Sequence, residues 1–165
     1  MATSCGACEV GIESTIVDCT RGVPVLLRPG AITRDDIERA CGQRPLSKEE
    51  LQANTPRASG TLLAHYAPNA KVRLMDAKQL QAALDMLGTD GKNIAVYHRS
   101  PLSNASQGVH LRPMPQQALG AAHELFGALR DFDAIGAQLI WIETPPDTAD
   151  WEGVRDRLQR AAAAG

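Results

Sequence analysis

With 165 residues, 44% of them apolar and only 4% aromatic, the chain can form one ordinary domain, or a small domain with part of another, packed by Leu, Val, Ile and Ala. Its formal net charge of −2, from seventeen basic and nineteen acidic side chains, provides no overall field for a polyanion and argues against tight, direct binding of nucleic acid. No apolar run approaches the roughly 20 residues that span a bilayer, and the N-terminus lacks the order of a signal peptide, so we expect a cytoplasmic protein without membrane contact.

The first part of the chain is predicted to form two strands and a helix. Two aliphatic runs flank a turn at 20–22 and indicate a pair of strands within the first thirty residues. Thr33 is the expected N-cap of the following helix, and Gly42 is its expected end. Ile37 and Ala40 supply the apolar stripe of this helix.

A stretch without periodicity follows and mixes charged residues with Pro and Gly, which is typical of an extended connection. We therefore divide the chain into three parts. Residues 1–44 are the strands and helix of a first domain, residues 45–69 are an interdomain linker, and residues 70–165 are a second domain. Because the first domain has no room upstream for the rest of its sheet, we expect it to be incomplete.

Strands and helices alternate regularly from residue 70 onward. Strands are predicted at 71–75, 93–98, 109–114 and 138–143, and helices at 77–87, 116–131 and 151–164. The long middle helix is expected to bury a stripe made of Leu119, Ala122, Phe126 and Leu129. This order predicts an α/β fold: a small three-layer, Rossmann-like domain with a mainly parallel sheet of about four strands.

Four cysteines lie in the first quarter of the chain. Cys5 and Cys8 have the two-residue gap of a zinc knuckle, but such a site needs a second close pair. Cys19 and Cys41 stand far apart, so reduced structural thiols are the favoured interpretation and zinc is the alternative. We predict no protein-bound metal.

Ser14, Thr15 and Arg28 are the candidate ligand-binding residues. If the two predicted strands pair, a Ser-Thr hydroxyl pair lies near an arginine, and hydroxyls with a guanidinium form charge-assisted hydrogen bonds to phosphate oxygens. The alternative is that the hydroxyls are ordinary strand residues and that Arg28 lies on the surface. A second candidate, the trio His98 to Ser100, follows a strand where α/β sheets bind ligands, although a solvated loop is the favoured interpretation there.

Three motifs carry a family resemblance. They are Gly11-Ile-Glu-Ser-Thr-Ile-Val-Asp18, Leu27-Arg-Pro-Gly-Ala-Ile-Thr33 and His65-Tyr-Ala-Pro68. In this order they resemble the carboxy-terminal part of the long threonylcarbamoyl-AMP synthases, the Sua5/YrdC/YwlC family. The resemblance implies that residues 1–44 end a YrdC-like catalytic domain, as a partial twisted sheet, and that residues 70–165 are a Sua5 domain.

The resemblance implies an enzyme that converts ATP, L-threonine and bicarbonate to threonylcarbamoyl-AMP and pyrophosphate, with Mg²⁺ accompanying ATP. A tRNA-modification complex then transfers the threonylcarbamoyl group to tRNA. Ser14 and Thr15 would contact nucleotide phosphates or threonine, and Arg28 would neutralise charge on the triphosphate. No covalent protein nucleophile is needed, and no catalytic residue is assigned.

Two features depart from the family pattern. His65 and Tyr66 resemble the linker that covers the reaction chamber, but the preceding residues, 58–64, lack the aromatic and basic side chains common in relatives. The family's Lys-x-Arg and Ser-x-Asn elements have no counterpart here. We therefore expect this chain by itself to be inactive or nearly so.

Alternatives remain from other classes. The chain could be a non-catalytic, nucleotide-sensing or regulatory interaction module that shares the same fold. A receiver-like signalling domain also suits the second half, but an acidic cluster at the end of its first strand is missing. An exposed sheet edge makes a homodimer possible under any of these interpretations.

Overall fold

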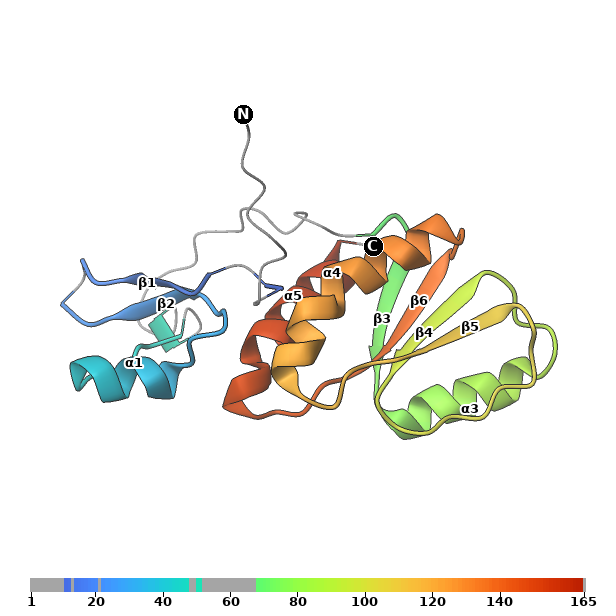
Figure 1. Ribbon diagram of the computed structural model, residues 1–165, viewed down its shortest axis with the longest axis horizontal. Coiled ribbons are helices and arrows are strands. Elements are labelled where there is room, and N and C mark those ends of the chain that lie inside the picture. Colours follow the sequence, from blue (N-terminus) through green and yellow to red (C-terminus); the bar gives the residue numbers. More distant parts are fainter. Residues whose placement is uncertain (1–10, 13, 21, 48–49, 52–67, 165) are drawn as a thin grey trace, which may run out of the picture.

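The computed structural model describes residues 11–12, 14–20, 22–47, 50–51 and 68–164, and these form a two-stranded and a four-stranded sheet with flanking helices (Figure 1). The α/β class and the mainly parallel sheet predicted from the sequence are confirmed. The division into three domains stays a prediction.

The two-stranded sheet is an antiparallel hairpin. Strands β1 (Ile16–Asp18) and β2 (Val25–Arg28) pair as expected from the two aliphatic runs. The connection that follows the first helix returns to this hairpin, because Leu46 N–H donates to the carbonyl of Pro24 and the Leu46 carbonyl accepts from Leu26. The start of the predicted linker therefore packs beside β2.

Helix α1 (Arg34–Cys41) has the predicted ends. The Thr33 hydroxyl accepts from Asp36 N–H, the Asp36 carboxylate accepts from Thr33 N–H, and the two form a capping box. Gly42 ends the helix with φ 74°, a left-handed conformation that glycine adopts without strain. The predicted apolar stripe was wrong, since Ala40 is exposed and Ile37 only half-buried. The ends of α1 are therefore set by local hydrogen bonds and not by burial of one face.

The four-stranded sheet is parallel throughout. Its strands are β3 (Lys71–Met75), β4 (Ile94–His98), β5 (Val109–Pro113) and β6 (Leu139–Glu143), in the spatial order β3-β6-β4-β5. The most apolar strand, β6, thus lies in the middle, where both faces are covered. Helix α3 (Ala77–Leu87) packs Leu80 and Leu84 against one face.

Two helices cover the other face. Helix α4 (Ala118–Ala134) and helix α5 (Glu152–Ala163), which follows a short 3₁₀ turn η1 (Ala149–Trp151), enclose the larger core with the inward side chains of the sheet. In α4 the predicted stripe was partly wrong. Leu119 is 59% exposed, whereas the buried face consists of Ala118, Ala121, Ala122, Leu125, Ala128, Leu129 and Phe132. Four alanines in this face let the helix lie close to its neighbours. A prediction based mainly on the large apolar residues therefore places the buried face wrongly.

Among the described residues, no helix is long and apolar enough to cross a bilayer. The larger core consists mostly of aliphatic side chains and includes the aromatic residues Tyr97, Phe132 and Trp151. Tyr97 on β4 and Phe132 on α4 meet edge to face, with ring centroids 6.0 Å apart. The Tyr97 side chain is fully buried, and its hydroxyl has no hydrogen-bond partner among the residues that the structure describes. Burial raises the pKa of Tyr97 to about 12.

We expect Tyr97→Phe to leave the free energy of unfolding unchanged or to raise it by about 1 kcal/mol, because it removes a buried hydroxyl that pays the loss of water without gaining a partner. Urea denaturation of both proteins measures the effect. Phe132→Leu is the matched control and should lower stability, since it removes ring contacts without removing a polar group. A loss above about 1 kcal/mol for Tyr97→Phe would show that the hydroxyl is paired in solution.

Candidate functional site

The hairpin brings two of the predicted site residues together. Arg28 Nε donates to the main-chain carbonyl of Ser14 at 3.0 Å. The pairing of Ile16 with Arg28, followed by that of Val17 with Leu26, leaves Leu27 as an extra residue, a bulge of the kind that redirects neighbouring side chains. The guanidinium is therefore held beside the Ser14 backbone, and the Ser14 side chain is exposed.

Thr15 has a structural contact that its sequence context did not reveal. Its hydroxyl donates to the carbonyl of Ile32 at 3.0 Å and accepts from the N–H of the same residue at 3.2 Å. A hydroxyl has one proton to donate, so this proton is committed to the turn between β2 and α1. Thr15 can still accept a hydrogen bond from a ligand, and it fixes the turn that follows Arg28.

Residues before the hairpin anchor it on the four-stranded domain. Ile12 is 8% exposed and belongs to the core beneath α4 and α5. A Cβ atom placed on Gly11 would lie 2.1 Å from His123 Cα in α4, and one placed on Gly153 in α5 would lie 2.6 Å from Ile12 Cδ1. The chain can approach the helices this closely only because both positions are glycine. The sequence motif that begins at Gly11 does not predict this contact.

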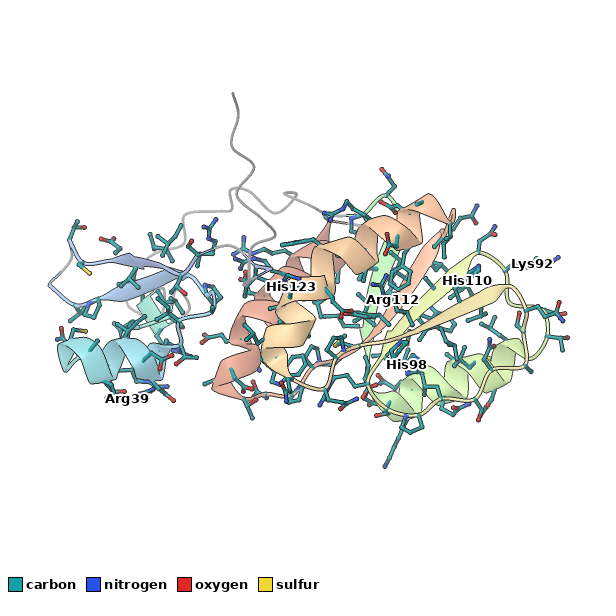
Figure 2. The ribbon with its side chains drawn as sticks, viewed as in Figure 1. Arg39, Lys92, His98, His110, Arg112 and His123 are labelled. Atoms are coloured by element: carbon teal, nitrogen blue, oxygen red, sulfur yellow. The ribbon has the colours of Figure 1, made fainter. Side chains whose placement is uncertain are left out.

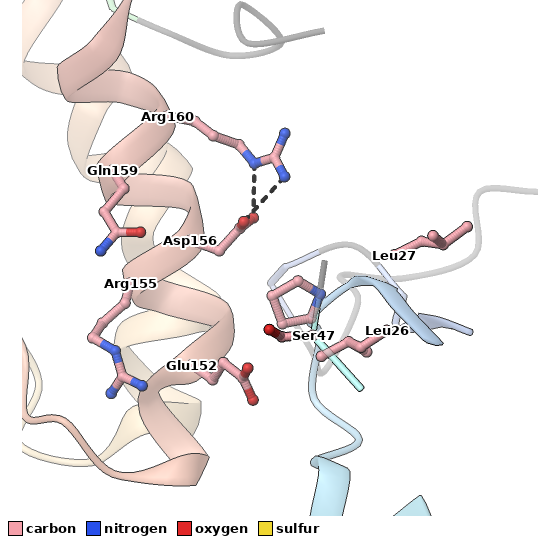
Figure 3. A pocket seen from close by; sticks show the side chains of 9 residues that line it. Leu26, Leu27, Ser47, Glu152, Arg155, Asp156, Gln159 and Arg160 are labelled. Carbon is pink, nitrogen blue, oxygen red and sulfur yellow. Dashed lines mark hydrogen bonds and ion pairs between the residues drawn. The ribbon is translucent and has the colours of Figure 1, made fainter. Parts of the chain in front are cut away.

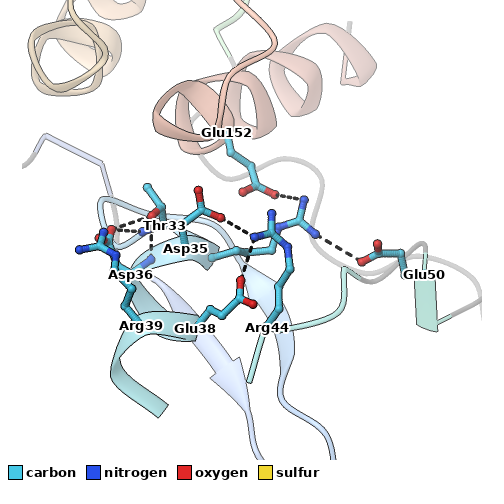
Figure 4. A network of polar contacts seen from close by, with 9 residues as sticks. Thr33, Asp35, Asp36, Glu38, Arg39, Arg44, Glu50 and Glu152 are labelled. Atoms are coloured by element: carbon cyan, nitrogen blue, oxygen red, sulfur yellow. Dashed lines mark hydrogen bonds and ion pairs between the residues drawn. The ribbon is translucent and has the colours of Figure 1, made fainter. Parts of the chain in front are cut away.

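A salt bridge reinforces the same contact (Figure 4). Arg34, at the start of α1, lies between Glu50 and Glu152, with nitrogen-to-oxygen distances of 3.3 Å to each. Glu152 begins α5, and its side chain is 22% exposed. This pair joins α1 directly to helix α5. Its contribution to stability is expected to be small because both groups remain in contact with water.

The second candidate is the trio His98 to Ser100 at the end of β4, and its hydrogen-bond donors bind other groups of the protein. The buried Glu143 carboxylate at the end of β6 accepts from the N–H groups of Arg99 and Ser100, at 2.6 and 2.7 Å, and from the Ser100 hydroxyl at 2.8 Å. Burial by itself would raise the pKa of Glu143, but the hydrogen bonds from Ser100 and Arg99 outweigh it and hold the pKa below its ordinary value. The Arg99 guanidinium lies over the Trp151 ring, 4.8 Å from its centroid. This cluster therefore ties β4 to β6.

The next group comprises the histidines and cysteines of the chain. His98, His110 and His123 lie on three different elements (Figure 2). Cys19 and Cys41 are exposed, free thiols, and the described part of the chain has no group of three His, Cys, Asp or Glu side chains placed to hold a metal ion. Cys5, Cys8, His65 and Tyr66 fall outside the described residues, so the predicted linker lid stays a prediction.

The fold and the hairpin site define an α/β protein in which a polar β-hairpin is docked on a parallel-sheet domain. The family model described as "Threonylcarbamoyl-AMP synthase, C-terminal domain" matches residues 32–163. The chain belongs to this family, and the resemblance inferred from its motifs is confirmed.

Curated relatives and solved structures agree. The chain is 29% identical to the threonylcarbamoyl-AMP synthase of Bacillus subtilis and 28% identical to that of Pyrococcus abyssi, covering 95% of this chain and 47% of each relative. A doubly substituted Sua5 from P. abyssi matches with a TM-score of 0.75 at 23% identity, over 94% of this chain and 46% of that one. P. abyssi Sua5 complexed with L-threonine matches with a TM-score of 0.73 at 26% identity, over 94% and 47%. The chain spans about half the length of these relatives.

We expect Gly11→Ala to lower the free energy of unfolding by about 1 to 3 kcal/mol, because the new methyl group meets the backbone of α4, which cannot move aside as a side chain does. The control is Gly127→Ala, also in α4, where a Cβ meets nothing within 4 Å and better helix propensity should raise stability by about 0.5 to 1 kcal/mol. Equal behaviour of the two variants in urea denaturation would contradict the docking of residues 11–12.

Glu143→Gln should lower the free energy of unfolding by about 1.5 to 3 kcal/mol at pH 7, because an amide presents N–H to a site lined by donors. A depressed pKa makes this stabilisation complete above the ordinary value of 4.5 and removes it as pH falls through the lower folded-state value. The difference between the two proteins should therefore shrink in acid. Glu124→Gln, an exposed control on α4, should change little, and a gap for Glu143→Gln that stays constant down to about pH 3 would contradict the charged cluster.

Proposed function

We propose that this chain supplies part of an enzyme that makes threonylcarbamoyl-AMP and pyrophosphate from ATP, L-threonine and bicarbonate for tRNA modification. The observation that carries the proposal is the Arg28 guanidinium held against the Ser14 backbone, on a hairpin that precedes the residues matched by the family model. This geometry presents a fixed positive charge beside an exposed hydroxyl, a combination suited to phosphate oxygens.

The hairpin would act by positioning and electrostatics, without a covalent intermediate. Threonylcarbamate would attack the α-phosphate of ATP, and the displaced pyrophosphate carries negative charge that Arg28 is placed to stabilise. The exposed Ser14 hydroxyl could donate to a phosphate or to the threonine carboxylate. Thr15, whose proton is given to Ile32, would accept from a ligand donor such as the threonine ammonium group. Mg²⁺ would enter with ATP and would neutralise part of the phosphate charge, and no residue of this chain is assigned to hold it.

The complete activity would need residues that the relatives carry in their other half. The chain corresponds to 47% of the length of the B. subtilis and P. abyssi synthases, and the hairpin forms one wall of the proposed site. A single wall leaves most of the nucleotide surface in water, whereas tight binding sites bury most of the surface of their ligand. The 165 residues by themselves are therefore expected to show little or no synthesis. The complete enzyme would pass the adenylate to a tRNA-modification complex.

Arg28→Ala should lower kcat/KM for ATP by roughly 10- to 150-fold, equivalent to 1.5 to 3 kcal/mol for a hydrogen bond to a charged group. The assay is pyrophosphate release with threonine and bicarbonate, using this chain extended by the amino-terminal half of the B. subtilis relative. The unextended chain is measured beside it.

Arg39→Ala is the matched control, because Arg39 is an exposed arginine of the same hairpin unit, on α1 (Figure 2). It should leave both kinetic constants unchanged. Unchanged constants for Arg28→Ala would remove Arg28 from the site. Full activity of the unextended chain would overturn the requirement for a second wall.

A further inference from the structure

A groove of about 240 Å³ separates the hairpin from helix α5 (Figure 3). Leu26, Leu27 and Pro29 form its wall on the hairpin side, and α5 contributes Glu152, Arg155, Asp156, Gln159 and Arg160. The Arg155 guanidinium is paired with Asp147 at 3.1 Å, so Glu152, Asp156 and Arg160 are the candidate charged groups for a ligand. The described lining residues do not include the candidate site residues of the hairpin. The groove is therefore a second concave feature, distinct in its residues from the proposed phosphate wall.

The helix wall presents both signs of charge in successive turns. Arg160 donates to the two oxygens of Asp156 at 2.8 and 3.0 Å, and Asp156 also accepts from Arg157 at 2.6 Å. Glu152 is paired at 3.3 Å with Arg34. The side chains of Glu152 and Asp156 are each 22% exposed, and that of Arg160 is 29% exposed. These charges are thus partly shielded but reachable from the groove.

This distribution selects against ligands that carry one charge only. An anion that approaches Arg160 also approaches two carboxylates, and a cation that approaches the carboxylates also approaches Arg160. A ligand with both signs can satisfy each, since its carboxylate replaces Asp156 on Arg160 while its ammonium group meets Asp156 and Glu152. Asp156 keeps Arg157 during this exchange. Replacing Asp156 by the ligand carboxylate costs little free energy, because partly exposed ion pairs of this kind contribute little to stability.

The opposite wall and the size of the groove define the rest of the ligand. Leu27 and Pro29 are half-buried and present apolar surface that favours an aliphatic group, whereas Leu26 is only 5% exposed. The volume lies below the range of about 300 to 1,000 Å³ occupied by drug-sized ligands. We propose that the groove between β2 and α5 binds a small aliphatic amino acid in its zwitterionic form, with its charged groups on α5 and its side chain against Leu27 and Pro29.

A bound amino acid would connect the two parts of the chain. Its charged end would lie on α5 of the parallel-sheet domain, and its apolar end would lie on β2, the strand that ends at Arg28. Occupancy would therefore hold β2 closer to α5, beside the existing contact of Arg34 with Glu152. The groove is a place where amino-acid concentration can influence the hairpin without the ligand entering the phosphate wall.

The test is titration of the full 165-residue chain with L-leucine, followed through the backbone amide resonances in NMR spectra. Leucine should shift amides of β2 and α5 saturably, with a Kd in the millimolar range, about 1 mM. L-Alanine should bind roughly tenfold more weakly, because it leaves most of the apolar wall uncovered. N-Acetyl-L-leucine and L-leucinamide, which carry one charge each, should both lose roughly tenfold or more.

Arg160→Gln should weaken leucine binding roughly tenfold by removing the partner of its carboxylate, and Arg39→Gln on α1 is the matched control that should not. Binding of N-acetyl-L-leucine as tight as that of leucine would overturn the zwitterion assignment. Absence of saturable shifts in β2 and α5, or shifts confined to other elements, would overturn the site itself. Neither outcome depends on ATP or on synthase activity, so the proposed function is tested separately.

Discussion

The arrangement of this protein depends on the contact of residues 11 and 12 with helices α4 and α5. Gly11 reaches the backbone of α4 at His123, and Ile12 is buried in the core of the parallel-sheet domain. A larger residue at position 11 would separate the surfaces, and the buried area of Ile12 would be lost with it. The hairpin that follows is thereby held in place at its base, and the Arg34 to Glu152 ion pair acts on the same boundary from the other side.

This anchoring gives the candidate site its geometry. Two adjacent hydroxyl residues play different parts: the Thr15 hydroxyl holds the turn after β2, and the Ser14 side chain stays exposed while its carbonyl accepts from Arg28. The candidate site is thus a surface of few polar groups held by hydrogen bonds. A surface of this kind suits chemistry in which the protein positions reactants and stabilises developing charge.

Charged side chains lie in two different environments in the part of the chain that contains the parallel sheet. At the carboxyl ends of β4 and β6, Glu143 takes up the donors of Arg99 and Ser100, so this edge of the sheet is satisfied within the protein. Along α5, by contrast, Asp156 and Arg160 form a partly exposed ion pair at the margin of a groove. Several hydrogen bonds to the buried Glu143 carboxylate hold the strand ends together. A partly exposed ion pair contributes little to stability and can exchange its partners more easily. This difference is why the groove, and not the strand ends, is the place proposed for a small ligand.

Local sequence determined much of the fold, because capping boxes, glycine ends and the two periodicities act over a few residues. The ranges of β3 and α3, the caps of α1 at Thr33 and Gly42, and the family motifs were all readable in this way. Tertiary structure decided what depends on distant partners. The strand order, the true buried face of α4 with Leu119 outside it, the engagement of Thr15 by Ile32 and the approach of Gly11 to His123 join residues far apart in the sequence. The periodicity of apolar residues in the sequence does not predict such contacts, because each of them exists only after the chain has folded.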